Sequence, residues 1–145
     1  SFYHNNSTLQ YDSIIANPPY FDSSSSTRIE LESRRKARTN EFLPPEDLLR
    51  IAFKILHPLG SFSLILPTKE GDFFLKMAAT YTFYIKRKVA VIPKIGKAAN
   101  RLLIELTRYP TICLPQEFTI RTSENTAHNY TQAFKELHQR FYLFL

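Results

Sequence analysis

Apolar residues along this chain form short continuous runs that alternate with stretches of helical spacing. The runs at Tyr11–Ala16 and Ser61–Leu66 are rich in β-branched and large aliphatic residues, and each is closed by proline. Such runs are typical of strands in a parallel sheet that is covered on both faces. Residues 45–56 and 69–81 instead place apolar side chains three and four positions apart, which predicts two helices.

The ends of these helices carry recognisable signals. Pro44, Pro45 and two acids suit the first turn of a helix, because proline lacks the donor that this turn leaves unpaired. Pro58 and Gly60 are expected to end the same helix. In the second helix the side chains expected to face inward are those of Phe73, Phe74, Met77 and Ala78.

The remaining elements turn the sheet antiparallel. Residues 83–92 and 101–107 predict two strands, of which Lys86–Ile92 and Arg101–Thr107 form a hairpin joined by a basic loop at 93–100. Gln116–Arg121 predicts a short further strand. Residues 129–144 predict an amphipathic helix whose aromatic stripe packs in the core. The order predicts an α/β fold with two βα units, then an antiparallel hairpin and a C-terminal helix. Ligands in such sheets bind at the carboxyl ends of the strands.

The amino-acid composition excludes several classes of binding site. The 145 residues suit one domain, and only 3 are glycine, which excludes the glycine-rich loops of dinucleotide-binding and P-loop proteins. One cysteine excludes a disulfide framework, and the four histidines have no ligand spacing, so we expect no metal. The apolar runs fall short of the ~18 residues of a membrane span, so no membrane partner is expected either.

Positive charge is concentrated in two places. The formal net charge is +6, and the segment from Tyr84 to Arg108 holds seven cations against one anion, Glu105. A second cluster contains Arg34, Arg35 and Arg38. Concentrated cations suit a phosphate backbone, although a solvated basic face is the alternative interpretation.

The segment Asn17-Pro18-Pro19-Tyr20-Phe21 follows the first predicted strand. The side-chain oxygen of Asn17 and the carbonyl of Pro18 could together accept both hydrogens of an exocyclic amino group. Tyr20 could stack on the ring that bears this amino group. The pattern therefore favours recognition of a planar amine such as an unstacked adenine.

Asn-Pro-Pro-Tyr after an apolar strand resembles a motif of the amino methyltransferases, which use S-adenosylmethionine. With the flanking segments Arg34–Arg38, Gly60–Pro67, Asn100–Glu105 and Asn129–Phe134, nearly the whole chain resembles the bacterial tRNA (adenine-N6) methyltransferases that modify valine tRNA beside the anticodon. The resemblance implies the C-terminal part of a Rossmann-like class I methyltransferase fold, a cytoplasmic enzyme and tRNA as partner.

The resemblance also implies roles for individual residues. Asn17, Pro18 and Tyr20 would be catalytic, with Asn17 also reaching the cofactor, and Pro19 and Phe21 would line the adenine pocket. The cations expected to bind tRNA phosphates are Arg34, Arg35, Arg38, Lys94, Lys97 and Arg101. Methylation of a DNA adenine or a protein glutamine is an alternative, because the motif serves those reactions too. A non-catalytic RNA-binding fragment is another.

The family's glycine-rich cofactor loop has no counterpart in this sequence. We therefore expect residues 1–145 to be the C-terminal part of a single methyltransferase domain, without its N-terminal cofactor-binding part and inactive in isolation. The strand at Tyr11–Ala16 would then expose an apolar edge. That edge is expected to pair with the missing N-terminal segment or with a second copy.

Overall fold

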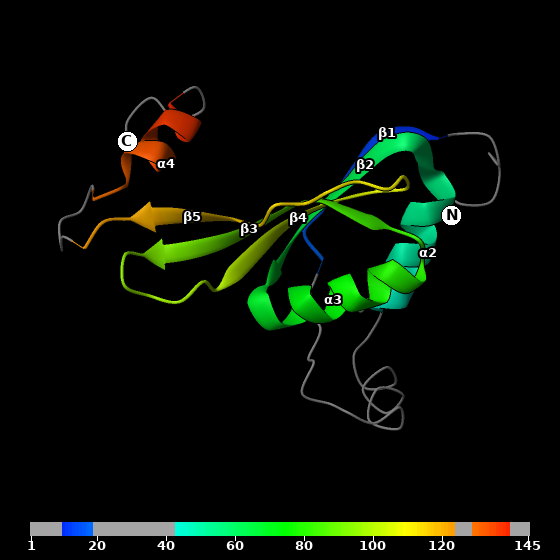
Figure 1. Ribbon diagram of the computed structural model, residues 1–145, viewed down its shortest axis with the longest axis horizontal. Coiled ribbons are helices and arrows are strands. Elements are labelled where there is room, and N and C mark those ends of the chain that lie inside the picture. Colours follow the sequence, from blue (N-terminus) through cyan, green and yellow to red (C-terminus); the bar gives the residue numbers. More distant parts are fainter. Residues whose placement is uncertain (1–9, 19–42, 124–128, 140–145) are drawn as a thin grey trace.

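The computed structural model describes residues 10–18, 43–123 and 129–139, which form a five-stranded sheet with helices (Figure 1). The strand order is β1-β2-β4-β3-β5, and the pairs β1–β2 and β3–β5 are parallel while β2–β4 and β4–β3 are antiparallel. The predicted hairpin is therefore confirmed. The strands are β1 (Tyr11–Ala16), β2 (Leu56–Pro67), β3 (Tyr84–Lys94), β4 (Arg101–Thr107) and β5 (Gln116–Arg121).

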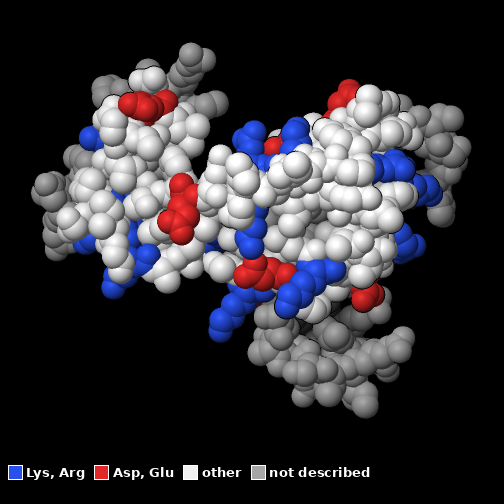
Figure 2. All heavy atoms as spheres, in the orientation of Figure 1, with Lys and Arg blue, Asp and Glu red and all other residues white. Residues whose placement is uncertain are grey.

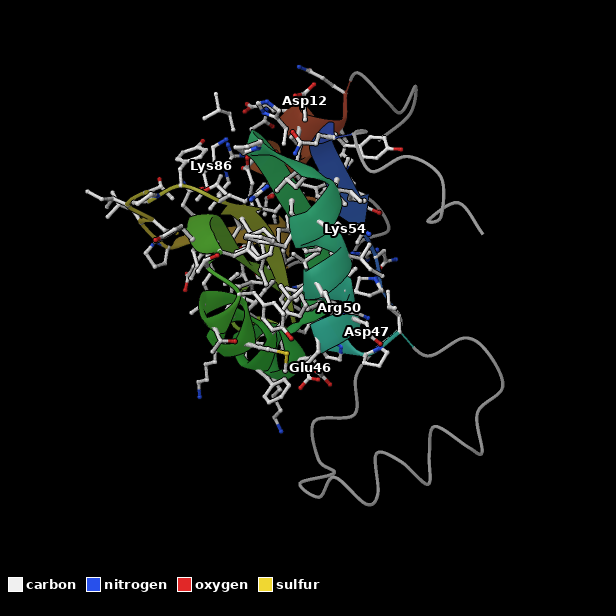
Figure 3. All side chains as sticks on the ribbon, turned by 90° about the vertical axis from the view of Figure 1, so that its right-hand side faces the viewer. Asp12, Glu46, Asp47, Arg50, Lys54 and Lys86 are labelled. Carbon is white, nitrogen blue, oxygen red and sulfur yellow. The ribbon has the colours of Figure 1, made fainter. Side chains whose placement is uncertain are left out.

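Two helices, α2 (Pro45–Ile55) and α3 (Thr68–Thr80), pack side by side against β2, and α3 also contacts β3 and β4 (Figure 1). Figure 3 shows Glu46 and Asp47 at the start of α2 and Lys54 in its last turn, which complements the helix dipole. The third helix, α4 (Gln132–His138), contacts β5 at the far end of the molecule. No helix of the described residues is long and apolar enough to cross a membrane.

The core lies between the sheet and the helices α2 and α3. Alternate residues of β2 and β4 are buried against these helices, as strand periodicity requires. Phe62 of β2 is fully buried and lies between the rings of Phe74 and Phe83, with ring centroids 6.4 and 6.1 Å away. Aromatic side chains bury a large apolar area each, so this cluster adds to the stability that the surrounding aliphatic core provides.

The expected end of the first helix was wrong. The helix ends at Ile55, and β2 begins at once, so Pro58 and Gly60 lie inside a strand. Tyr11 pairs with Leu56 but Ser13 pairs with Ser61, so residues 57–60 bulge from the ladder. A proline is tolerated in such a bulge because the ladder there needs no donor from it.

The inward face of α3 also differs from the prediction. Phe73 is 47% exposed, while Gly71, Phe74, Leu75 and Ala78 are buried. These four positions have the i, i+3, i+4, i+7 spacing of a single helical face, and Phe73 lies beside it. Met77 is only partly buried.

At the C-terminal side, β3 runs two residues further than predicted, to Lys94. No residue of α4 is buried, so the expected core packing of the aromatic stripe is wrong for the described part of that stripe. The rings of Tyr130 and Phe134 instead stack on one another, and Phe134 contacts Phe118 of β5. This stripe holds α4 on the edge strand.

Strand directions bring distant loops to one end of the sheet. Since β1 and β2 are parallel, and β4 is antiparallel to both β2 and β3, the carboxyl ends of β1, β2, β3 and β5 share one end with the start of β4. Three segments therefore meet this end of the sheet: Asn17 and Pro18 after β1, the start of α3 after β2, and residues 95–100 between β3 and β4.

Candidate functional site

Asn17 and Pro18 continue directly from β1, whose last residue, Ala16, pairs with Leu64. Asn17 is exposed and Pro18 is buried. Among the described residues, none forms a hydrogen bond with the side chain of Asn17. Within the described part of the chain, the strand therefore presents the Asn17 amide without a hydrogen-bond partner, at the end of the sheet where ligands are expected. The other candidates Pro19, Tyr20, Phe21, Arg34, Arg35 and Arg38 lie outside the described residues.

The basic loop is fixed to the same end of the sheet by backbone contacts. Thr68, the first residue of α3, donates two hydrogen bonds to this loop. Its hydroxyl donates to the Ala99 carbonyl at 3.1 Å, and its N–H donates to the Asn100 carbonyl at 3.3 Å. The N–H of Lys97 donates to the Lys94 carbonyl at 3.0 Å, and Gly96 takes the positive φ of 79° that this turn requires.

Several cations of the basic segment are already used inside the fold. Lys86 and Arg87 lie 2.8 and 3.6 Å from the carboxylate of Glu105, and Lys88 lies 2.8 Å from that of Asp72. The hydrogen bond from Lys86 to Glu105 raises the pKa of Lys86 above its ordinary value of 10.5. Two carboxylates therefore offset two of these three positive charges, which makes this part of the basic segment less attractive to an anionic ligand.

Arg108 also has a structural role. Its guanidinium lies 4.1 Å from the centre of the Phe53 ring and donates to the Leu56 carbonyl at 2.9 Å. A guanidinium stacked on an aromatic ring and bonded to backbone acts as part of the packing between α2 and the sheet.

The candidates Lys94, Lys97 and Arg101 lie together at the hairpin tip. Within the described ranges, no acidic side chain forms an ion pair with Lys94 or Lys97. Arg101 donates to the Asn100 carbonyl at 2.9 Å, which holds its guanidinium beside the loop. Figure 2 shows cations at this tip, apart from the mixed acidic and basic side chains over the middle of the sheet.

One cation at this end was missed by sequence reasoning. Arg121, the last residue of β5, pairs in register with Lys94. The residues next to Arg121 in the sequence do not indicate that it lies beside Lys94, because only the parallel pairing of β3 and β5 brings the two cations together. In the part of the chain that the structure describes, no group of three or more His, Cys, Asp or Glu side chains could hold a metal ion.

The arrangement of strands and helices is that of the class I methyltransferases. A predicted O-methyltransferase from Agrobacterium tumefaciens superposes with a TM-score of 0.57 at 20% identity, over 89% of this chain and 51% of that one. The methyltransferase subunit of a type I restriction-modification system from Streptococcus thermophilus gives 0.50 at 15% identity, over 97% and 33%. The expected fold class is thus confirmed.

Sequence comparison is more specific. No family model matches. The chain is 33% identical over 138 residues to a tRNA1(Val) (adenine(37)-N6)-methyltransferase of Bacteroides fragilis, covering 95% of this chain and 56% of the relative. The enzyme of that name from Aliivibrio fischeri is 34% identical over 134 residues, covering 92% and 55%. The chain is a homologue of these proteins, which confirms the resemblance seen in the sequence, and it spans about half of their length.

Proposed function

We propose that this chain is the substrate-binding part of an S-adenosylmethionine-dependent methyltransferase that methylates the N6 atom of adenine 37 in valine tRNA. The observation that carries the proposal is the position of Asn17 and Pro18, which lie at the same end of the sheet as Lys94 and Lys97, two cations that no described acidic side chain pairs with. A base-modifying enzyme needs both an amine-binding loop and a phosphate-binding loop, and here both follow strands at one end of the sheet. The names of the homologues supply the specific base and tRNA. A tRNA substrate would place the reaction in the cytoplasm.

In the proposed mechanism, the Asn17 side-chain oxygen and the Pro18 carbonyl accept the two hydrogens of the adenine amino group. S-adenosylmethionine would supply the methyl group to which the N6 lone pair bonds and would retain its sulfur as a neutral thioether, and N6 would lose its extra proton to solvent. Positive charge grows on N6 during transfer, so both acceptors stabilise the transition state more than the bound substrate. Tyr20 would stack on the extruded adenine, with Pro19 and Phe21 lining its pocket.

S-adenosylmethionine would supply the electrophilic methyl group when bound. The exposed amide of Asn17 fits a polar group of this cofactor, because its donors and its acceptor are free of partners in the described residues. The other cofactor contacts would come from the additional half that the relatives possess. Calorimetry should accordingly show negligible cofactor binding by residues 1–145 alone, and micromolar binding would contradict this division.

The tRNA backbone would lie across the hairpin tip, where Lys94, Lys97 and Arg101 contact phosphates. The candidates Arg34, Arg35 and Arg38 would extend this contact. Phosphate contacts position a nucleic acid without reading its sequence, so these residues would orient the anticodon loop towards Asn17.

The edge strand β1 supports the proposal that residues 1–145 are one part of a larger domain. Ile15 of β1 is 83% exposed, and Tyr11 is 50% exposed. The unpaired backbone N–H and C=O groups of an exposed apolar edge strand can form hydrogen bonds with a further strand. We expect the cofactor-binding part to pair along β1. Residues 1–145 alone should then associate through this edge, and a monomer at high concentration in sedimentation would contradict the expectation.

The deciding assay is transfer of labelled methyl to valine tRNA by the complete protein. Asn17→Ala and Tyr20→Ala should each abolish transfer, whereas Gln116→Ala removes an exposed amide at the opposite end of β5 and should leave it intact. Full activity of Asn17→Ala would overturn the mechanism. Preferred methylation of a DNA adenine or a protein glutamine would overturn the tRNA substrate and support one of the alternatives.

A further inference from the structure

Arg121 lies beside the basic loop at the carboxyl end of β5. Its Cα pairs with that of Lys94 in the parallel β3–β5 ladder, and its carbonyl accepts the N–H of Ile95 at 2.9 Å. The side chain is exposed. Arg121 is therefore fixed by its backbone next to Lys94, at the end of the sheet that also carries Asn17.

An aromatic column holds the guanidinium in place. It lies 5.1 Å from the centre of the Tyr130 ring and within 3.5 Å of the Tyr130 hydroxyl, to which it donates. Tyr130 stacks on Phe134 with centroids 4.8 Å apart, and Phe134 stacks on His138 at 3.9 Å. A guanidinium within about 6 Å of a ring centre is attracted by the ring face.

Backbone contacts fix the column to the sheet. Arg121 and Tyr130 form an antiparallel bridge, and the N–H of Thr131 donates to the Ile120 carbonyl at 2.9 Å. The Thr131 hydroxyl donates to the Thr119 carbonyl at 2.6 Å and also accepts from the N–H of Phe134, which caps α4. These hydrogen bonds join α4 to β5, although α4 has no buried residue.

The charge of Arg121 is not neutralised within the described residues, since no acidic side chain there forms an ion pair with it. Glu117 lies four residues earlier on β5, about 13 Å away along an extended strand, which exceeds the screening length at physiological salt. Glu136 of α4 accepts a hydrogen bond from Gln132 instead. The guanidinium is therefore available to an anion that binds from outside this part of the chain.

We propose that Arg121 is a further phosphate-binding residue for tRNA, whose guanidinium is oriented by the Tyr130 ring. Arg121 would extend the interface from the hairpin tip across to β5. The inference rests on the proposed function. Arginine binds phosphate through two parallel hydrogen bonds, which a correctly oriented guanidinium forms with less loss of side-chain entropy. Tyr130 supplies that orientation and is a positioning residue.

The test is binding of fluorescently labelled valine tRNA to the complete protein, followed by anisotropy over a range of KCl concentrations. Arg121→Gln should weaken binding by about 3- to 10-fold and reduce the slope of log affinity against log salt by about 1, because one phosphate contact is lost. Tyr130→Leu should weaken binding by about 2- to 3-fold with an unchanged slope, since the charge remains. Tyr130→Phe keeps the ring and loses only the exposed 3.5 Å hydrogen bond to the hydroxyl, which is too long to contribute much, so it should bind like the parent protein.

Arg50→Gln is the matched control, because Arg50 is an exposed arginine on α2, paired with Asp47 and away from the hairpin (Figure 3). If Arg121→Gln binds with the affinity and slope of Arg50→Gln while Lys97→Gln weakens binding, the inference is overturned and the proposed function stands. If the parent protein does not bind tRNA, both are overturned. Arg121→Lys keeps the charge, so it should retain the slope of log affinity against log salt. It replaces Arg121→Gln in the test if Arg121→Gln does not fold.

Discussion

The hydroxyl of Thr68 donates a hydrogen bond to the carbonyl of Ala99 at 3.1 Å, across 31 positions of sequence. Thr68 begins α3, directly after β2, and Ala99 lies in the loop between β3 and β4. This contact joins the end of a core strand to the loop that carries Lys97. It ties the position of the basic loop to the core, in addition to the turn that Gly96 forms within the loop.

Thr68→Val should loosen this loop. The substitution keeps the shape of the side chain but leaves the Ala99 carbonyl without its donor, and we expect the free energy of unfolding to fall by about 1 kcal/mol. Affinity for valine tRNA should fall about twofold as the loop cations become less ordered. Thr68→Ser, which keeps the hydroxyl, is the control. Equal tRNA affinity of the two variants would show that the contact does not position the loop.

Gly60→Ala should separate β1 from β2. A Cβ at Gly60 would lie 2.8 Å from the carbonyl oxygen of Asp12 and 3.0 Å from that of Tyr11, and backbone atoms in a ladder cannot move aside easily. We expect a loss of about 1–3 kcal/mol in urea unfolding, together with reduced methyl transfer because β1 carries Asn17. Ser61→Ala, at the next position of β2, should change stability far less. A stable and fully active Gly60→Ala protein would argue against the close pairing.

Arg108→Met should affect stability and not tRNA binding. The substitution removes the guanidinium from the Phe53 ring and leaves the Leu56 carbonyl without its donor, so we expect a loss of about 1–3 kcal/mol. Arg108→Lys should recover little of it, because an ammonium cannot stack and bond in the same geometry. The salt dependence of tRNA affinity should match the parent protein. A slope reduced by about 1 would instead place Arg108 in the interface.

The ion pair of Lys86 with Glu105 should give stability a dependence on alkaline pH. The pKa of Lys86 is raised above 10.5 by Glu105, so the pair stabilises the folded state fully at pH values below the unfolded pKa. That contribution is lost as the pH rises through the raised, folded pKa. The stability difference between the parent protein and Lys86→Gln should therefore be constant from pH 8 to about 10 and shrink above this.

The effect should be small because Lys86 is exposed, and urea unfolding at closely spaced pH values would measure it. Lys76→Gln is the control, since Lys76 is an exposed lysine of α3 with no ion pair among the described residues. A difference that stays constant up to pH 11.5 for Lys86→Gln would contradict the pairing.

Local sequence patterns predicted most elements because each was bounded by a local signal. The strands β1 and β5 have the predicted limits, and α2 begins at the predicted proline. The predicted limits of an element were wrong where those limits depend on how one strand pairs with another. The bulge at residues 57–60 depends on how β1 meets β2, so no local rule could place Pro58 inside a strand.

The sequence by itself determined the elements, their order and the amine-binding chemistry of Asn17 and Pro18, since these depend on residue type and near neighbours. Only the tertiary structure decided which cations a ligand could reach. Across strand and helix contacts, Glu105 pairs with both Lys86 and Arg87 and Asp72 pairs with Lys88, so two carboxylates offset two of these three positive charges. The β3–β5 ladder places Arg121 beside Lys94. The availability of a charge depends on the distance to its neighbours in space, and the sheet register sets that distance between residues far apart in the chain.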